Sequence, residues 1–301
     1  MEKKKNDFIA QGSILAIASI LVRVMGMIYR IPMTAIIGDK GNGFYSYAYS
    51  VYTILLLLSS YSLPLAVSKM VSAKAQLGQW RNVKRVFICA IAFAIGIGTT
   101  FGLIVLIGAQ FFTRVFFHSE LAAIALRFMA PTILIMALLG VFRGFFQGLQ
   151  NTLPTAVSQI VEGLINAIMS VVFAYFLFDF GHGMDVASGT TDLGYAWGAA
   201  GGAIGTGAGA LAGLIFCFIL FVAYRKILAV NISRDKTGTQ QEYGDIFRLM
   251  LSIALPVILS TALYNLIELV DGSLFNNIMA SKGMEDVKDS MWGAYNAKAL
   301  L

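Results

Sequence analysis

Long, continuous apolar runs limit the possible folds of this chain more than any other feature. Each run approaches or exceeds the roughly 20 residues that an α-helix needs to cross a hydrocarbon core of about 30 Å. In lipid only helices and closed barrels satisfy the backbone polar groups, and these runs do not alternate as barrel strands do. We therefore predict membrane-spanning helices near residues 9–37, 44–67, 86–112, 122–149, 155–180, 195–224 and 247–279, with an eighth beginning at Met291.

The composition supports burial in a membrane. Hydrophobic residues make up 58% of the 301 positions and charged residues 13%, and the mean hydropathy is +0.76. A soluble domain carries about 45–50% apolar and about 25% charged residues. The net charge is +6, but the basic residues lie beside the apolar runs, which is typical of membrane topology and argues against a nucleic-acid partner.

The distribution of charge between the loops predicts the orientation of the chain. Lys and Arg concentrate at the N-terminus and in residues 68–85 and 225–246, whereas residues 179–194 carry three Asp residues and no Lys or Arg. Basic loops stay on the cytoplasmic side of a membrane. We therefore expect a multi-pass protein with a cytoplasmic N-terminus, in contact with membrane lipids.

A weak internal repeat predicts two helical lobes. The segment Gly43-Phe-Tyr45-Ser-Tyr-Ala opens the second predicted span, and Gly293-Ala-Tyr295-Asn-Ala-Lys opens the eighth. Parallel repeats of this kind are common in transporters. We predict an all-α integral membrane bundle with a six-helix lobe at 1–226, a cytoplasmic linker at 227–246 and the start of a second, truncated lobe at 247–301. Pro32 predicts a kink in the first span, and the glycines between 194 and 213 predict close helix packing.

Two arginines lie inside the first predicted span. Arg23 and Arg30 are seven residues apart, so they share one helix face about 10 Å apart. A charge at the bilayer centre costs about 2.5–3.5 kcal/mol on insertion scales, so such residues face a cavity or a partner. Paired guanidinium groups suit a doubly charged anion such as a diphosphate. The alternative is that Arg30 reaches the headgroups and only Arg23 is buried.

Polar residues also form stripes on two later spans. The stripes contain Gln159, Glu162 and Asn166 on one helix, and Glu268 and Asp271 on another. They are candidates for lining an aqueous cavity or binding a coupling ion, such as a monovalent cation. The alternative is structural, with Glu162 paired to Arg143 or Arg127 so that the helices stay in register.

Catalytic motifs are absent from the sequence. His118 and His182 lie in separate loops without neighbouring ligands, and no GxSxG, Walker or HExxH pattern occurs. Cys89 and Cys217 fall inside apolar runs without metal-ligand spacing. We therefore expect no enzyme activity, no cofactor and no metal.

Two segments resemble a known family of transporters. They are Phe142-Arg-Gly-Phe-Phe-Gln-Gly-Leu-Gln-Asn-Thr-Leu-Pro-Thr-Ala-Val-Ser-Gln-Ile-Val-Glu162 and Val22-Arg-Val-Met-Gly-Met-Ile-Tyr-Arg30. Both resemble the MurJ/SpoVB-type oligosaccharide flippases of the MATE-like exporter superfamily. The resemblance implies two helical lobes around a cavity that opens alternately to each side of the bacterial cytoplasmic membrane. It also implies a substrate in which a sugar is linked to undecaprenyl diphosphate.

The resemblance assigns roles to three basic residues. Arg23 matches a cavity arginine of the family, Arg30 lies one position later than a second one, and Lys298 falls where MurJ has a basic residue in helix eight. A further cavity arginine of the MurJ pattern has no counterpart in 55–63. The family is longer than 301 residues, so we expect this chain to be an N-terminal part that inserts but does not transport alone.

These observations predict a flippase that exports a lipid-linked cell-wall or polysaccharide precursor, lipid II being the first choice, by alternating access. Arg23, Arg30 and Lys298 would hold its diphosphate. The nearest alternative is a MATE-type drug/cation antiporter, which favours acidic and aromatic cavity residues. A membrane glycosyltransferase acting on polyprenyl-linked sugars is an alternative from a different class, although the loops here are short. A third alternative is a scaffold protein without transport activity.

Overall fold

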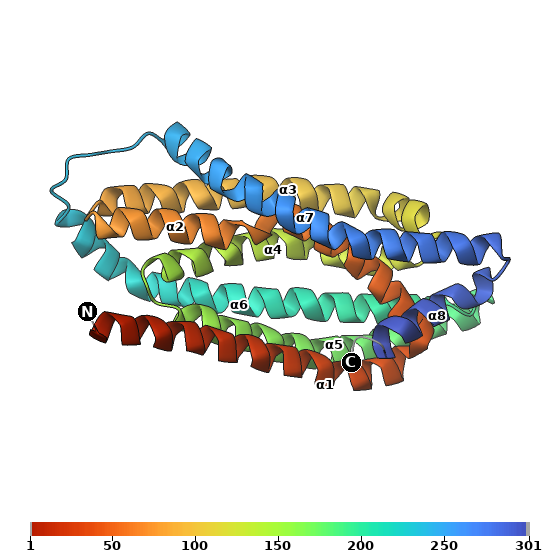
Figure 1. Cartoon of the computed structure of the whole chain (residues 1–301). Coiled ribbons are helices and arrows are strands. Elements are labelled where there is room, and N and C mark those ends of the chain that lie inside the picture. The colour runs from red at the N-terminus through yellow and green to blue at the C-terminus, as the bar shows by residue number, and fades with distance from the viewer. Residues whose placement is uncertain (1, 299–301) are drawn as a thin grey trace.

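The protein folds as a bundle of long helices (Figure 1). The computed structural model describes the backbone of residues 2–298 and their side chains, except those of 2–11, 61, 262–265, 268, 297 and 298. The elements are α1 (Glu2–Leu56), a π-helical turn η1 (Leu57–Tyr61), α2 (Leu63–Gln76), α3 (Trp80–Phe117), α4 (Ala122–Gly148), α5 (Leu153–Ser188), α6 (Leu193–Ser233), α7 (Tyr243–Ser281) and α8 (Glu285–Lys298). Within the described residues, each predicted span lies mainly on helical chain, so the prediction of an all-α membrane bundle is confirmed.

Six helical stretches of the described chain are long and apolar enough to cross a membrane. The first, Gly12–Gln76, contains the second predicted span and all of the first one from residue 12 onward. The second predicted span passes through η1 into α2, where Pro64 occupies the first turn, the helical position that tolerates a missing N–H. Helix α2 continues beyond the predicted end of that span at residue 67, to Gln76.

The bend in α1 lies at Gly38 rather than at Pro32. Gly38 has φ 63° and ψ −179°, a conformation open to glycine because it lacks a Cβ. Pro32 is accommodated inside the helix without non-helical dihedral angles. The predicted kink at Pro32 is thus wrong, and the chain reverses direction at Gly38 instead. We call this end of the bundle the Gly38 end, and the opposite end, where the α6–α7 connection lies, the linker end (Figure 1).

Helices α5 and α6 lie side by side at short distance because small residues line their contact. A Cβ added at Gly201 would lie 2.4 Å from backbone atoms of Phe173 and Ala174, and one added at Gly205 would lie 2.3 Å from the nitrogen of Ser170. Backbones that approach so closely exclude larger residues. The predicted role of the glycine-rich stretch in helix packing is confirmed.

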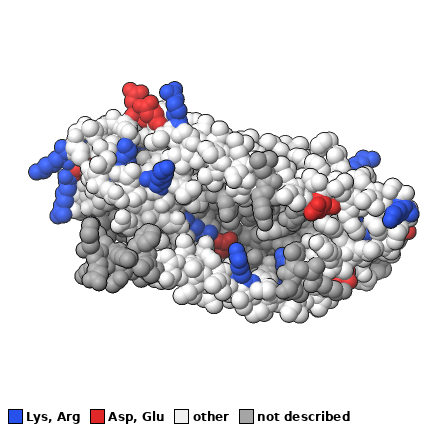
Figure 2. Space-filling model, viewed as in Figure 1, with Lys and Arg blue, Asp and Glu red and all other residues white. Residues whose placement is uncertain are grey.

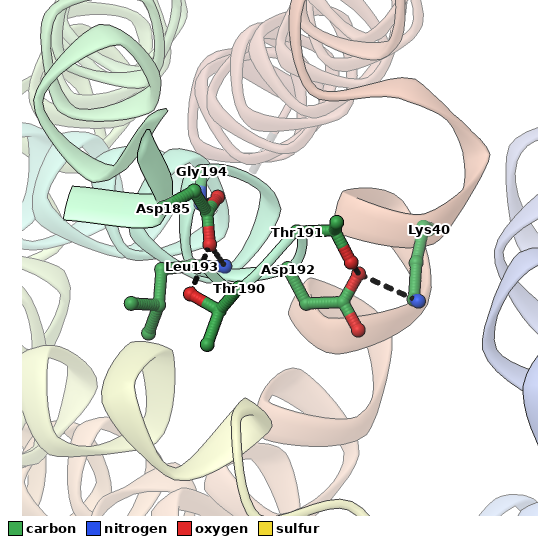
Figure 3. Close-up of polar contacts among 7 residues, drawn as sticks. All are labelled: Lys40, Asp185, Thr190, Thr191, Asp192, Leu193 and Gly194. Atoms are coloured by element: carbon green, nitrogen blue, oxygen red, sulfur yellow. Dashed lines mark hydrogen bonds and ion pairs between the residues drawn. The ribbon is translucent and has the colours of Figure 1, made fainter. Parts of the chain in front are cut away.

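At the Gly38 end, polar contacts hold the α5–α6 connection against α1 (Figure 3). Lys40 donates to Asp192 across 2.8 Å. Asp185, which is buried, accepts hydrogen bonds from the backbone N–H of Leu193 (3.0 Å) and of Gly194 (2.8 Å) and so caps the start of α6.

At the linker end, the α6–α7 connection is bound to the start of α3. The side chain of Asn82, fully buried, donates to the carbonyl of Thr239 (3.1 Å) and accepts from the N–H of Gln241 (3.0 Å). Asp235 accepts from the N–H of Arg81 at 2.9 Å. The non-helical connection covers 234–242, because α6 continues to Ser233. It is therefore shorter than the linker predicted at 227–246.

Helix α8 crosses the second half of α1 at the Gly38 end. It begins at Glu285, not at Met291 as the apolar pattern predicted. Glu285 and Asp286 lie in its first turn, where negative charge stabilises the helix dipole, so the helix begins before the apolar run. The ring centroids of Trp292 in α8 and Tyr47 in α1 are 6.2 Å apart. The Tyr47 ring also stacks on Phe117 of α3, with centroids 4.6 Å apart. These rings close the bundle at this end.

Candidate functional site

A cavity of about 380 Å³ lies between the first half of α1 and α5. We call it the arginine cavity, because both Arg23 and Arg30 line it, together with Tyr29, Tyr49 and Asn166. Figure 2 shows that this face of the molecule is hollowed, with basic and acidic atoms inside the hollow. The seven-residue spacing on one helix therefore brings both guanidinium groups to one cavity.

Neither arginine is neutralised by the described part of the protein. Arg23 is exposed and Arg30 is half-buried. The ion pairs among the described side chains are Lys40–Asp192, Arg114–Glu120 and Arg143–Glu162. Two cations on an apolar helix, with no described carboxylate paired to them, leave the arginine cavity suited to an anionic ligand.

A second cavity of about 210 Å³ continues toward the Gly38 end. It shares Tyr29, Arg30 and Tyr49 with the arginine cavity. Its other lining groups include hydroxyl, amide and phenol side chains: Thr34, Asn42, Tyr45, Ser46 and Asn296. We call it the tyrosine pocket, and α8 contributes to it through Asn296.

Glu162 is held by a partner within the bundle. Its Oε2 lies 2.7 Å from Nη2 of Arg143, and Nε of Arg143 donates to Oγ of Ser158 at 2.8 Å. The pair joins α4 to α5, and its side chains are 11% and 24% exposed. This is the structural alternative considered for Glu162, with Arg143 as the partner. Arg127 is exposed elsewhere on α4.

The other members of the polar stripes separate in space. Asn166 lines the arginine cavity and accepts a hydrogen bond from Ser170 at 2.8 Å. The Oε1 atom of Gln159 is buried and has no hydrogen-bond partner among the described residues. Asp271 is exposed on α7. The side chains of Glu268 and Lys298 lie outside the described residues.

Sequence reasoning missed the residues of the tyrosine pocket. One helix face carries polar or aromatic residues every three or four positions: Asn42, Tyr45, Ser46 and Tyr49. This helical period is the sequence signal that could have identified them. Asn296 lies on a different helix, α8, so the helical period of α1 does not identify it. Among the described His, Cys, Asp and Glu side chains, no group of three is placed to hold a metal ion.

Comparisons with known proteins place this geometry in a family. The family described as "Polysaccharide biosynthesis protein" matches residues 8–299. The chain is 26% identical over 290 residues to the lipid II flippase MurJ of Bacillus subtilis, covering 92% of this chain and 51% of that protein. It is 26% identical over 266 residues to stage V sporulation protein B of the same organism, covering 87% and 48%. The chain therefore spans about half the length of these relatives.

Solved structures show the same fold. A MOP superfamily transporter from Pyrococcus furiosus matches with a TM-score of 0.62 at 16% identity, covering 94% of this chain and 61% of that one. A MATE protein in complex with MaD3S matches with a TM-score of 0.59 at 13% identity, covering 96% and 69%. The predicted MATE-like architecture is confirmed. The chain belongs to the polysaccharide biosynthesis protein family.

Proposed function

We propose that this protein takes part in flipping an undecaprenyl-diphosphate-linked cell-wall or polysaccharide precursor, with lipid II as the first choice, across the bacterial cytoplasmic membrane. The observation that supports this most directly is the arginine cavity, where Arg23 and Arg30 have no described ion-pair partner. A diphosphate supplies the two negative charges that such a pair of guanidinium groups can bind.

The polarity of the cavity separates this function from its alternatives. A drug/cation antiporter favours acidic residues in its cavity, whereas the described lining of the arginine cavity contains two arginines and no carboxylate. A glycosyltransferase requires a catalytic carboxylate beside a sugar-binding loop, and the described loops are short. An anion-binding cavity inside an apolar helical bundle fits a transporter of anionic lipids better than either.

The membrane potential favours export of such a substrate. Moving one elementary charge across 100 mV is worth about 2.3 kcal/mol. A diphosphate with two negative charges therefore gains roughly 4–5 kcal/mol on leaving a negative interior. This argument requires the orientation predicted from the loop charges, with the N-terminus and the linker end in the cytoplasm. A monovalent cation bound near Asp271 and Glu268 is the candidate for any further coupling.

Substitution of Arg23 tests the proposal. Flipping of lipid II by a form of the protein that carries both helical lobes can be followed in proteoliposomes by the accessibility of its headgroup to a reagent that does not cross the bilayer. A charge-assisted contact contributes about 1.5–3 kcal/mol, so Arg23→Ala should slow flipping by about ten- to a hundredfold, and Arg23→Lys should retain part of the rate.

Arg127→Ala is the matched control, because Arg127 is also an exposed arginine on a membrane helix but does not line the arginine cavity. It should flip at the wild-type rate. Full activity of Arg23→Ala, with protein abundance unchanged, would show that the arginine cavity does not bind the diphosphate. Faster transport of an organic cation than of lipid II would favour the antiporter instead.

A further inference from the structure

The tyrosine pocket differs chemically from the arginine cavity that it adjoins. The arginine cavity has two guanidinium groups, whereas the tyrosine pocket has one, Arg30, at the boundary between them. The rest of the described lining is aromatic, hydroxyl or amide, apart from Met33. A ligand that reaches from one into the other must therefore carry negative charge at one end and neutral polar groups at the other.

The pocket presents a supported aromatic surface. The rings of Tyr45 and Tyr49 stack with centroids 5.8 Å apart and planes 19° apart, and Tyr52 lies 5.9 Å from Tyr49. Tyr49 is 38% exposed, whereas Tyr45 is buried and its hydroxyl lies 3.3 Å from that of Thr206 on α6. Tyr49 is thus an accessible ring fixed against a buried one. Such a ring offers a flat apolar face at little loss of conformational entropy.

The amide and hydroxyl groups around this surface remain able to accept hydrogen bonds. Nδ2 of Asn42 donates to the carbonyl of Gly293 (3.1 Å), and Nδ2 of Asn296 donates to that of Trp292 (3.0 Å). The hydroxyl of Ser46 donates to the carbonyl of Asn42 (2.8 Å). Each amide thus uses one of its two N–H groups within the protein and keeps the other, and the oxygen atoms of these side chains keep acceptor capacity. A sugar hydroxyl can donate to these oxygens and accept from the remaining N–H groups, whereas an ionised phosphate can only accept.

The pocket has room for one ring of a larger headgroup. Its volume of about 210 Å³ is below the roughly 300–1,000 Å³ of pockets that enclose drug-sized ligands. In a sugar diphosphate the first sugar is bonded directly to a phosphate. Because Arg30 and Tyr49 line both cavities, an anion in the arginine cavity would place its attached ring in the tyrosine pocket.

We propose that the tyrosine pocket binds the sugar ring attached to the diphosphate, with the apolar face of the ring against Tyr49 and its hydroxyls directed to Asn42, Ser46 and Asn296. This inference rests on the proposed function and adds to it a site that recognises the sugar. The arginines bind the diphosphate, which all polyprenyl diphosphates share. The tyrosine pocket distinguishes the lipids that carry a sugar from those that do not.

Binding of two probes separates the two sites. The probes are undecaprenyl diphosphate and undecaprenyl-diphosphate-linked N-acetylglucosamine, titrated against the protein in nanodiscs. Because Tyr49 also lines the arginine cavity, Tyr49→Ala should weaken binding of the sugar-bearing probe about three- to tenfold more than binding of the sugarless probe, the range expected for loss of one aromatic contact. Tyr49→Phe, which keeps the ring, should bind the sugar-bearing probe more tightly than Tyr49→Ala does.

Two controls make each outcome decisive. Tyr175→Ala removes a 60% exposed tyrosine from α5 that does not line the pocket, and should change neither titration. Arg23→Ala should weaken both probes equally. The sugar site is wrong if Tyr49→Ala leaves the sugar-bearing probe unaffected or weakens both probes alike. If Arg23→Ala affects neither probe, the proposed function fails with it, whatever Tyr49 does.

Discussion

Gly43 of α1 and Gly293 of α8 lie against each other where the two helices cross at the Gly38 end. A Cβ added at Gly293 would lie 2.6 Å from the nitrogen of Gly43 and 1.7 Å from the carbonyl oxygen of Asp39. A Cβ added at Gly43 would lie 2.2 Å from the carbonyl oxygen of Asp289. These glycines open the two copies of the weak sequence repeat, so the repeated segments meet at their matching positions.

Substitution of Gly293 by alanine should separate α8 from α1. The added methyl group meets backbone atoms, which cannot move aside by changing rotamer. Overpacking of this kind costs about 1–3 kcal/mol, so the melting temperature of the purified protein in detergent should fall. Gly183→Ala on α5 is the control, because nothing lies within 4 Å of its added Cβ. If Gly293→Ala melts no lower than Gly183→Ala, the close crossing is not formed in the membrane protein.

The Arg143–Glu162 pair should contribute to stability as a unit. Arg143→Leu leaves the partly exposed Glu162 carboxylate without its cation, so the cost should lie between the roughly 1 kcal/mol of an exposed pair and the roughly 3–5 kcal/mol of a buried one. Replacing both residues by leucine should recover most of that loss in a double-mutant cycle of unfolding free energies. The exposed Arg114–Glu120 pair is the control, and Arg114→Leu should cost less than about 1 kcal/mol. Additive losses in the double mutant would show that the two side chains are not coupled.

Asp235 should stabilise the linker end through its negative charge. The N–H of Arg81, with the hydroxyl and N–H of Thr237, lowers the pKa of Asp235 to about 2. Its ordinary value is about 3.9, so its contribution is full above about pH 4 and is lost as the pH falls toward about 2. Asp235→Asn should therefore lower the melting temperature by the same amount throughout pH 5–8, and the amides of 235–241 should exchange faster.

A matched variant removes a carboxylate from the same end of the bundle. Asp245 is exposed in the first turn of α7, so Asp245→Asn should leave exchange in 235–241 unchanged. A difference between Asp235→Asn and the wild type that varies within pH 5–8 would contradict the lowered pKa.

The orientation of the chain can be tested with single cysteines. Thr239 and Ala187 are exposed at opposite ends of the bundle. Each can be replaced by cysteine in a variant that lacks the two native cysteines, Cys89 and Cys217. On whole cells an impermeant thiol reagent should label Ala187→Cys and not Thr239→Cys. The reverse pattern would place the N-terminus outside.

The sequence alone determined the membrane class, the helical spans and the common face of Arg23 and Arg30. These features depend on composition and on the helical period, both of which are local. In a lipid bilayer an apolar run of about 20 residues satisfies its backbone hydrogen bonds by forming an α-helix. The limits of the prediction appear at helix ends: α8 begins earlier because Glu285 and Asp286 favour the helix start, a preference that hydropathy does not register.

Only the tertiary structure decided which polar groups meet. The periodic stripe of Gln159, Glu162 and Asn166 was equally consistent with a cavity lining and with an ion pair, and the packing of α4 on α5 assigned Glu162 to Arg143. The tyrosine pocket joins Asn42 to Asn296, which lie in helices that approach closely because Gly43 and Gly293 lack side chains. Helical periodicity determines which side chains share a face, but the contact between two faces depends on how distant helices pack.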